Sequence, residues 1–196
     1  PLGVLAAVNR GTWLDTSCRL LALVGAAVPS YVMAPVLMLF FAVKLGWLPA
    51  VGYGSPKNLL LPALALSFGT MAQLMRLTRA SVLDVLGQDY IRTARAKGLS
   101  ERSVVWGHGL KSALLPVVTV LGTSTGFLLG GAVIIESIFG WPGVGQFVIQ
   151  GISQRDYPVV QGFVLYMAVA FLLINLAVDV SYRWLDPRLH FGGKFN

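Results

Sequence analysis

The sequence predicts an all-α membrane protein, a polytopic helical bundle, and two observations lead to this class. Of the 196 residues, 56% are hydrophobic and only 12% are charged, whereas soluble domains carry about 25% charged residues. The apolar residues form long uninterrupted runs, without the alternation of apolar and polar residues that a membrane β-barrel strand requires. Because a helix satisfies its backbone hydrogen bonds within one segment, we expect these runs to cross a bilayer as helices.

Four runs are long enough to cross a membrane, and they predict four transmembrane helices. About 20 apolar residues cover a hydrocarbon core that is about 30 Å thick. The predicted spans are about 20–43, 58–78, 112–135 and 157–180. Pro29 and Pro35 interrupt the first span, which we expect to remain in the mature protein because it is longer than the apolar core of a signal peptide. Arg76 and Arg79 are expected to extend their charged ends toward lipid headgroups.

The basic residues predict that both ends of this chain and the segment before the third span lie in the cytoplasm. Lysine and arginine are retained preferentially on that side of a membrane. Most of the 15 basic residues fall in 1–19, 76–111 and 179–196. Only Lys44, Lys57 and Arg155 fall in the alternate segments. The net charge of +7 is therefore attributed to orientation and to anionic lipid, and no motif for reading nucleic acid accompanies it.

No pattern in the sequence predicts an enzyme, and no cofactor or metal is expected in this chain. His108 and His190 lack the spaced partners of a metal site. The nucleotide-binding pattern G-x-x-x-x-G-K-[ST] does not occur. The string GTSTG (122–126) fits the nucleophile pattern G-x-S-x-G, but it lies inside the third predicted span and not at a turn from a strand to a helix. Cys18 is a single cysteine and cannot form an intrachain disulfide.

The segment 136–156, between the third and fourth predicted spans, is expected at the extracytoplasmic surface. Trp141 and Tyr157 suit the headgroup level of a bilayer. Apolar residues recur near helical spacing at Val144, Phe147, Val148 and Ile152. This pattern indicates a short amphipathic helix in the interface, with an ordinary anchoring loop as the alternative.

The cytoplasmic segment at about 84–111 contains start and stop signals for a short, separate helix. Asp89 is expected to cap the start of this helix, and Gly98 supplies the left-handed conformation that ends one. Ser100 is expected to cap a second helix that continues toward Pro116. Because a helix of about eight residues is marginal in water, we expect its own flanking helices or a second protein to pack on it. A basic surface facing lipid is the alternative.

Six motifs, spread over nearly the whole chain, indicate a family. In chain order they are VPSYV (28–32), KLGWLPAVG (44–52), YIRTARAKGLS (90–100), ESIFGWPGVG (136–145), RDYPVVQG (155–162) and NLAVDVSYRWLDPRLHF (175–191). Together they resemble the ABC importer permeases of the dipeptide, oligopeptide and nickel branch. The sequence departs from the broad permease pattern at Arg92-Thr93-Ala94, where many members have Glu-Ala-Ala, and in a longer gap between Gly98 and Leu115. Both departures are typical of the peptide and nickel branch.

The resemblance implies a larger protein and a larger complex in the bacterial cytoplasmic (inner) membrane. Permeases of this branch usually have six spans, so the chain is expected to be the C-terminal two thirds of a subunit. The implied partners are a second homologous permease subunit, two ATP-binding subunits and an extracytoplasmic substrate-binding protein. ATP and magnesium would be bound by the ATP-binding subunits, and the lipid bilayer surrounds the spans.

The resemblance also implies that residues 90–101 dock into an ATP-binding subunit and pass its movement to the spans. The residues concerned are Tyr90, Ile91, Arg92, Thr93, Ala94, Arg95, Ala96, Lys97, Gly98, Leu99, Ser100 and Glu101. The implied function is a permease subunit of an ATP-driven importer for di- and oligopeptides. Nickel import by the same branch is one alternative, and a secondary transporter or channel that works without ATP is another. The four spans show neither the central charges nor the internal repeat that the second alternative predicts.

Polar and small residues within or directly after the third and fourth spans are further candidates. Glu136 directly follows an uncharged run, so it is a candidate for the translocation pathway or outer gate, with a charge that caps the end of the span as the alternative. Small residues four apart occur at Gly122, Gly126 and Gly130. Such spacing allows close helix packing within the subunit, or else a subunit contact or a pathway lining. Asn175, Asp179 and Arg183 share a helix face, and Asp179 and Arg183 are expected to form an ion pair, with a role in contacting substrate as the alternative.

Overall fold

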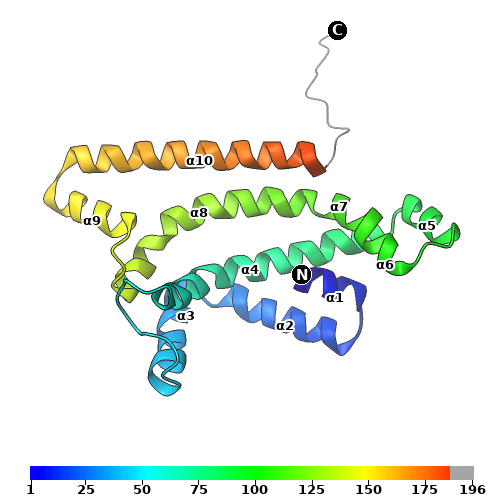
Figure 1. Cartoon of the computed structure of the whole chain (residues 1–196), viewed down its shortest axis with the longest axis horizontal. Helices are drawn as coiled ribbons and strands as arrows, with labels where there is room; N and C mark the ends of the chain where they lie inside the picture. The colour runs from blue at the N-terminus through cyan, green and yellow to red at the C-terminus, as the bar shows by residue number, and fades with distance from the viewer. Residues whose placement is uncertain (186–196) are drawn as a thin grey trace, which may run out of the picture. The chain divides into compact units, whose positions relative to one another are not determined.

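The computed structural model describes residues 1–185, apart from the side chains of residues 127, 130, 131, 184 and 185. This part of the chain is helical without any strand (Figure 1), which confirms the predicted all-α class. The elements are α1 (Leu2–Val8), α2 (Trp13–Ala27), α3 (Ser30–Leu37), the π-helix η1 (Met38–Lys44), α4 (Lys57–Leu86), α5 (Asp89–Ala96), α6 (Glu101–Ser103), the π-helix η2 (Val104–Gly109), α7 (Leu110–Ala113), α8 (Leu115–Phe139), α9 (Val144–Gln154) and α10 (Tyr157–Leu185). The end of the last sequence motif, with His190, lies outside the described residues.

Two helices in the described part are individually long and apolar enough to cross a membrane. They are α4 and α10. Three bent helix pairs also reach the required length and hydropathy, so the number rises to as many as five if each pair is one span. The helices are therefore those of a membrane protein, and the division into four spans stays a prediction.

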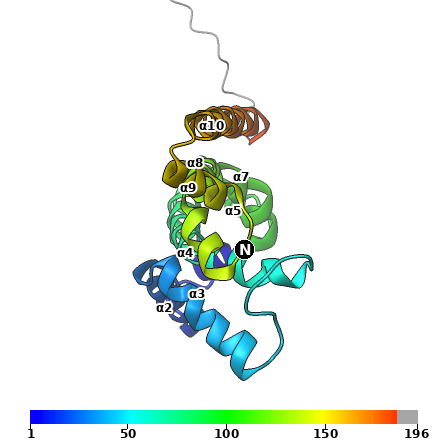
Figure 2. The same ribbon diagram turned by 90° about the vertical axis from the view of Figure 1, so that its left-hand side faces the viewer.

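The first predicted span is interrupted at the proline that the sequence indicated. α2 and α3 are separated by a bend of 108° (Figure 2). Pro29 precedes α3 with extended backbone angles (φ −60°, ψ 148°), and without an N–H it cannot continue the hydrogen bonding of α2. Pro35, by contrast, lies inside α3 and does not end it.

The segment that follows Gly98 begins as predicted but is not one continuous α-helix. Ser100 caps α6, and its hydroxyl oxygen accepts a hydrogen bond from the Ser103 N–H at 3.4 Å. The chain then passes through η2 and α7 and bends by 48° before α8. Pro116, in the first turn of α8, has no N–H to donate to the preceding turn, which explains a break at this point.

The described chain forms two compact units. Four helices are divided between them, so that each of these helices contributes residues to both units. The first unit contains Pro1–Leu20, Leu74–Thr123 and the described part of Ile174–Asn196, and the second contains Leu21–Gln73 and Ser124–Leu173. The helices shared in this way are α2, α4, α8 and α10.

The core of the first unit joins α1, the end of α4 and the segment from η2 to α7. Its buried residues are Val4, Ala7, Val82, Val105 and Ala113. Gly3 allows α1 to approach α4 closely, since a Cβ at this position would lie 2.6 Å from the Met75 carbonyl oxygen. The end of α4 therefore serves as the support on which α1 and α7 pack.

The core of the second unit is formed by α3, the first half of α4 and the end of α8. Its buried residues are Ala34, Leu61, Ala65, Ile135 and Phe139. A bend of 94° separates the end of α8 from α9 (Figure 1). This core fixes the end of α8 and hence the position of Glu136, which lies in its last turns.

Candidate functional site

The short helix α5 is fixed to its own unit by one apolar face. Ile91 is 0% exposed and Ala94 is 6% exposed. Both pack against Val104 of η2, with Val85 and Leu86 of α4 beside them. Flanking helices therefore supply the packing that an isolated helix of this length needs.

The ends of α5 are set by residues close to those that the sequence indicated. Gln88 is the N-cap and Asp89 is the first helical residue, so the prediction that Asp89 caps the helix is wrong. Asp89 still lies in the first turn, where a negative charge is favourable. Gly98 has the predicted left-handed conformation (φ +79°), and its N–H donates to the Arg95 carbonyl at 2.9 Å.

An ion pair closes the turn between α5 and α6. Arg95 Nε lies 2.7 Å from Glu101 Oε1, and a second nitrogen lies 3.2 Å from Oε2. The hydrogen bond from Arg95 holds the pKa of the Glu101 carboxyl below its usual range. A two-point contact of this kind fixes orientation as well as distance, so α5 and α6 are joined in a defined geometry.

The remaining residues of the predicted docking segment are exposed. Of residues 90–101, all except Ile91 and Ala94 lie at the surface, and these two are directed into the core of the unit rather than toward a partner. Tyr90 is 47% exposed, and Trp106 of η2 is 57% exposed in the same unit. Trp106 was not among the predicted docking residues, although a tryptophan in a segment rich in basic residues was a usable signal.

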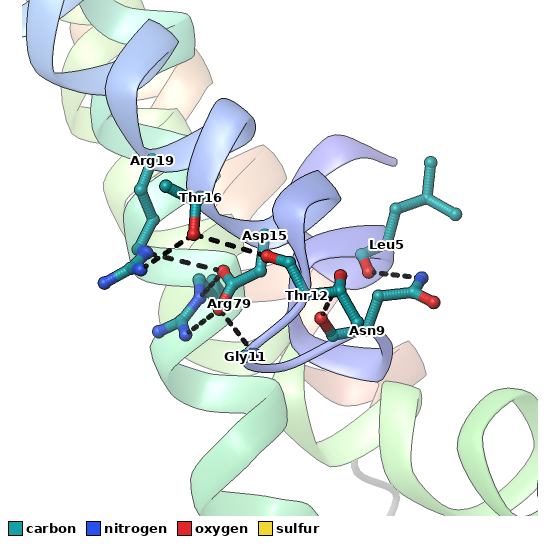
Figure 3. A network of polar contacts seen from close by, with 8 residues as sticks. All are labelled: Leu5, Asn9, Gly11, Thr12, Asp15, Thr16, Arg19 and Arg79. Atoms are coloured by element: carbon teal, nitrogen blue, oxygen red, sulfur yellow. Dashed lines mark hydrogen bonds and ion pairs between the residues drawn. The ribbon is translucent and has the colours of Figure 1, made fainter.

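A second polar cluster lies at the start of α2, and the sequence did not predict it (Figure 3). Asp15 is 1% exposed. Its oxygens accept hydrogen bonds from Arg79 Nε at 2.7 Å, from the terminal nitrogen of Arg79 at 2.8 Å and from the Gly11 N–H at 3.1 Å. Arg19 contributes a longer contact of 3.6 Å.

This cluster corrects the prediction that Arg79 extends toward lipid headgroups. Its side chain turns to the buried carboxylate of Asp15 on α2, which lies in the same unit. The two residues are 64 positions apart, so no local spacing could have indicated the pair. The arrangement joins α2 to α4 and offers no group that is placed for chemistry.

Glu136 contacts the start of α9. Its Oε2 accepts a hydrogen bond from the Gln146 N–H at 2.9 Å. Two glycines make this approach possible: a Cβ on Gly143 would collide with the Glu136 carboxylate, and a Cβ on Gly145 would lie 3.0 Å from Oε2. The motif ESIFGWPGVG is thus a connection in which the glutamate at one end binds the backbone that follows it.

A cavity of about 320 Å³ lies beside this connection, within the second unit. Its lining comes from α4, α8, α9 and α10, and the residues are Ala63, Leu66, Ser67, Thr125, Leu128, Leu129, Ala132, Glu136, Val144, Gly145, Phe163 and Tyr166. A volume near 300 Å³ is at the lower end of the range for small-molecule sites.

Two of the three glycines with four-residue spacing lie against α10. A Cβ on Gly122 would collide with Val178, and a Cβ on Gly126 would lie 2.8 Å from the ring of Phe171. Gly130 belongs to the same helix, α8. The predicted pair between Asp179 and Arg183 is not formed, because neither residue has an ion-pair partner within the described part of the chain.

The chain resembles known transport proteins over almost its full length. Residues 1–191 match the family described as binding-protein-dependent transport system inner membrane component. The glutathione transport system permease protein GsiC of Escherichia coli strain K12 is 45% identical over 189 residues, which cover 96% of this chain and 62% of the relative. The protein of the same name from Salmonella choleraesuis is 45% identical over 190 residues, covering 97% of this chain and 62% of the relative.

These matches confirm the resemblance that the sequence motifs indicated, to ABC importer permeases of the peptide and nickel branch. The chain spans 62% of the length of the curated relatives it matches. Members of the matched family are membrane-embedded transport components rather than enzymes. The chain belongs to the family of binding-protein-dependent transport system inner membrane components.

Proposed function

We propose that this chain is part of the permease subunit of an ATP-driven ABC importer for di- and oligopeptides. The observation that carries the proposal is the family match over residues 1–191. The relatives named above are described as glutathione transport permeases, and glutathione is a small peptide, which favours peptides over nickel as the cargo. The chain would form half of the translocation pathway, with a second homologous permease subunit forming the other half.

The exposed face of α5 and the following turn are the proposed docking surface for an ATP-binding subunit. This surface consists of Tyr90, Arg92, Thr93, Arg95, Ala96, Lys97, Gly98, Leu99, Ser100 and Glu101. Ile91 and Ala94 are omitted because they are buried. The burial of Ile91 and Ala94 supports the proposal, because it packs α5 on α4 and η2. A displacement of α5 is therefore passed on to α4 and η2.

ATP and magnesium would be bound by two ATP-binding subunits, and closure of these subunits would displace α5. The displacement reaches α4 through the packing of Ile91 and Ala94, and it reaches η2 through Val104. The spans would then change between inward-open and outward-open packings, two discrete states whose populations the nucleotide shifts. An extracytoplasmic binding protein would deliver the peptide to the opposite side.

We assign the other candidate residues to separate roles. Gly122 and Gly126 act in packing α8 against α10, because side chains of α10 occupy the space beside them. Glu136 and its cavity are retained for the translocation pathway. α5 would lie in the cytoplasm and α9 at the extracytoplasmic interface of the bacterial inner membrane.

Photo-crosslinking from α5 in the complete transporter tests this proposal. A photoreactive amino acid in place of Ala96, which is exposed, should capture the ATP-binding subunit in native membranes. The same replacement at Leu165, an exposed residue of α10, should not capture it. Absence of the ATP-binding subunit from the Ala96 product, with the complex intact, would contradict the proposed docking surface.

A further inference from the structure

The cavity beside Glu136 has one charged group in an otherwise apolar setting. Among the described lining residues, Glu136 is the only charged one. Hydroxyl groups are present on Ser67, Thr125 and Tyr166, and the Phe163 ring lies in the same lining. A pocket of this composition accepts a molecule with one cationic end and an apolar body, because such sites combine apolar walls with a few polar groups that set orientation.

The carboxylate of Glu136 is held in place but its hydrogen-bonding capacity is only partly used. Oε2 accepts the Gln146 N–H at 2.9 Å. Within the described chain, no donor bonds to Oε1. A carboxylate accepts several hydrogen bonds, and the first turn of α9 is a favourable place for its charge. The group is therefore positioned by the protein and still able to bind a donor.

From these observations we infer that the cavity binds a primary ammonium group, with Glu136 as its counter-ion. An ammonium offers three donors and a full positive charge. One carboxylate supplies too few ligands for a divalent cation, which takes six or more oxygens in the case of calcium. Given the proposed peptide transport, on which this step rests, the ligand is the amino-terminal end of a short peptide whose first side chain contacts Phe163 and Tyr166.

The experiment uses the complete transporter in nanodiscs and a dipeptide that carries a benzophenone side chain. One form of the dipeptide has a free amino terminus and the other is N-acetylated. The free form should crosslink to residues of the cavity lining, and the acetylated form should do so about tenfold less, because hydrogen bonds to charged groups are the stronger ones. Mass spectrometry of the crosslinked peptides gives the position.

The variant Glu136→Gln separates charge from helix capping. Its amide oxygen can still accept the Gln146 N–H, whereas the negative charge is lost. We expect the preference for the free amine to disappear in this variant. Asp179→Asn is the matched control, since it removes one negative charge from an exposed residue of α10 and should keep the preference.

Several outcomes overturn the inference. They are equal crosslinking of the two dipeptides to the wild-type complex, crosslinks outside the cavity, and an unchanged preference in Glu136→Gln. If that variant does not assemble, two results from the wild-type complex still test the inference. They are the ratio of crosslinking between the free and the acetylated dipeptide, and the position of the crosslink. ATP-driven import, measured with the same purified complex in proteoliposomes, distinguishes the failures: import without crosslinking in the cavity contradicts only the ammonium site, and absence of import contradicts the proposed function.

A lipid headgroup is a second source of the same chemistry, because phosphatidylethanolamine also carries a primary ammonium. Nanodiscs of phosphatidylcholine and phosphatidylglycerol are therefore compared with nanodiscs that contain phosphatidylethanolamine. Equal crosslinking in both assigns the site to the peptide. A strong decrease with phosphatidylethanolamine supports an ammonium site that the lipid occupies.

Discussion

At the scale of single residues, the connection between Glu136 and α9 depends on the absence of side chains at two positions. Gly143 has φ −98° and ψ 174°, which any residue adopts. A substitution there would therefore act through the collision of its Cβ with the Glu136 carboxylate and not through backbone strain. This makes Gly143 a direct test of the contact.

Gly143→Ala is expected to displace Glu136 and lower the stability of the protein by about 1–3 kcal/mol, as overpacking generally does. The measurement is the midpoint of thermal unfolding in detergent. Gly162→Ala is the matched control, because a Cβ at that position in α10 meets nothing within 4 Å. Equal midpoints for the two variants would show that the carboxylate does not contact the loop.

The pair of Asp15 and Arg79 is a second feature that acts at the level of residues. Asp15→Asn leaves the Arg79 guanidinium without its carboxylate, and removing one partner of a buried pair is more harmful than removing both. We expect the unfolding midpoint to fall more for Asp15→Asn than for the double variant with Arg79→Gln. Arg19→Gln removes a side chain that is 54% exposed and makes the longer contact, so it should change the midpoint little. If the decrease in the midpoint for the double variant equals the sum of the decreases for Asp15→Asn and Arg79→Gln, the two residues are not coupled.

At the scale of elements, local signals predicted the helices and their ends better than the bends between them. The stop at Gly98, the cap at Ser100 and the helix after Gly143 were all predictable, because glycine conformation, side-chain capping and apolar periodicity act over a few residues. The π-helix η2 was not predictable, since it depends on the packing of Val104 and Val105 in two cores. The same reason applies to the contacts of Arg79 and to the cavity around Glu136, which join distant segments.

The turn after α5 is the element whose geometry the proposed mechanism requires. Gly98→Val places a β-branched residue at φ +79°, where residues with a side chain incur about 1–2 kcal/mol. We expect normal membrane insertion and a marked loss of ATP-driven peptide import in the complete transporter. Gly87→Ala is the control: its Cβ would make only ordinary contacts, and no positive φ is involved. Import at the wild-type rate in Gly98→Val would contradict the requirement for a fixed turn.

At the scale of the whole molecule, the apolar surface requires surroundings that the chain itself does not provide. Large apolar residues of α10 are more than half exposed along its length, as at Leu165, Leu172 and Val180. A contiguous apolar surface of this kind marks contact with lipid or with other subunits. The apolar helices and the family membership both indicate a protein embedded in a membrane. The orientation of the chain in that membrane is a separate prediction.

The orientation predicts opposite accessibility for α5 and α9. Basic residues in the segment around α5 favour the cytoplasm, whereas α9 follows the end of α8 on the other side of that predicted span. In a transporter whose native cysteines, Cys18 included, are replaced by serine, single cysteines introduced at Lys97 and Ser153, both exposed, report the two sides. A membrane-impermeant maleimide should label Ser153→Cys in spheroplasts and Lys97→Cys only in inside-out vesicles. Labelling of both cysteines from the same side would mean that α8 does not cross the membrane. This result would contradict the proposal that a displacement of α5 is passed to the translocation pathway.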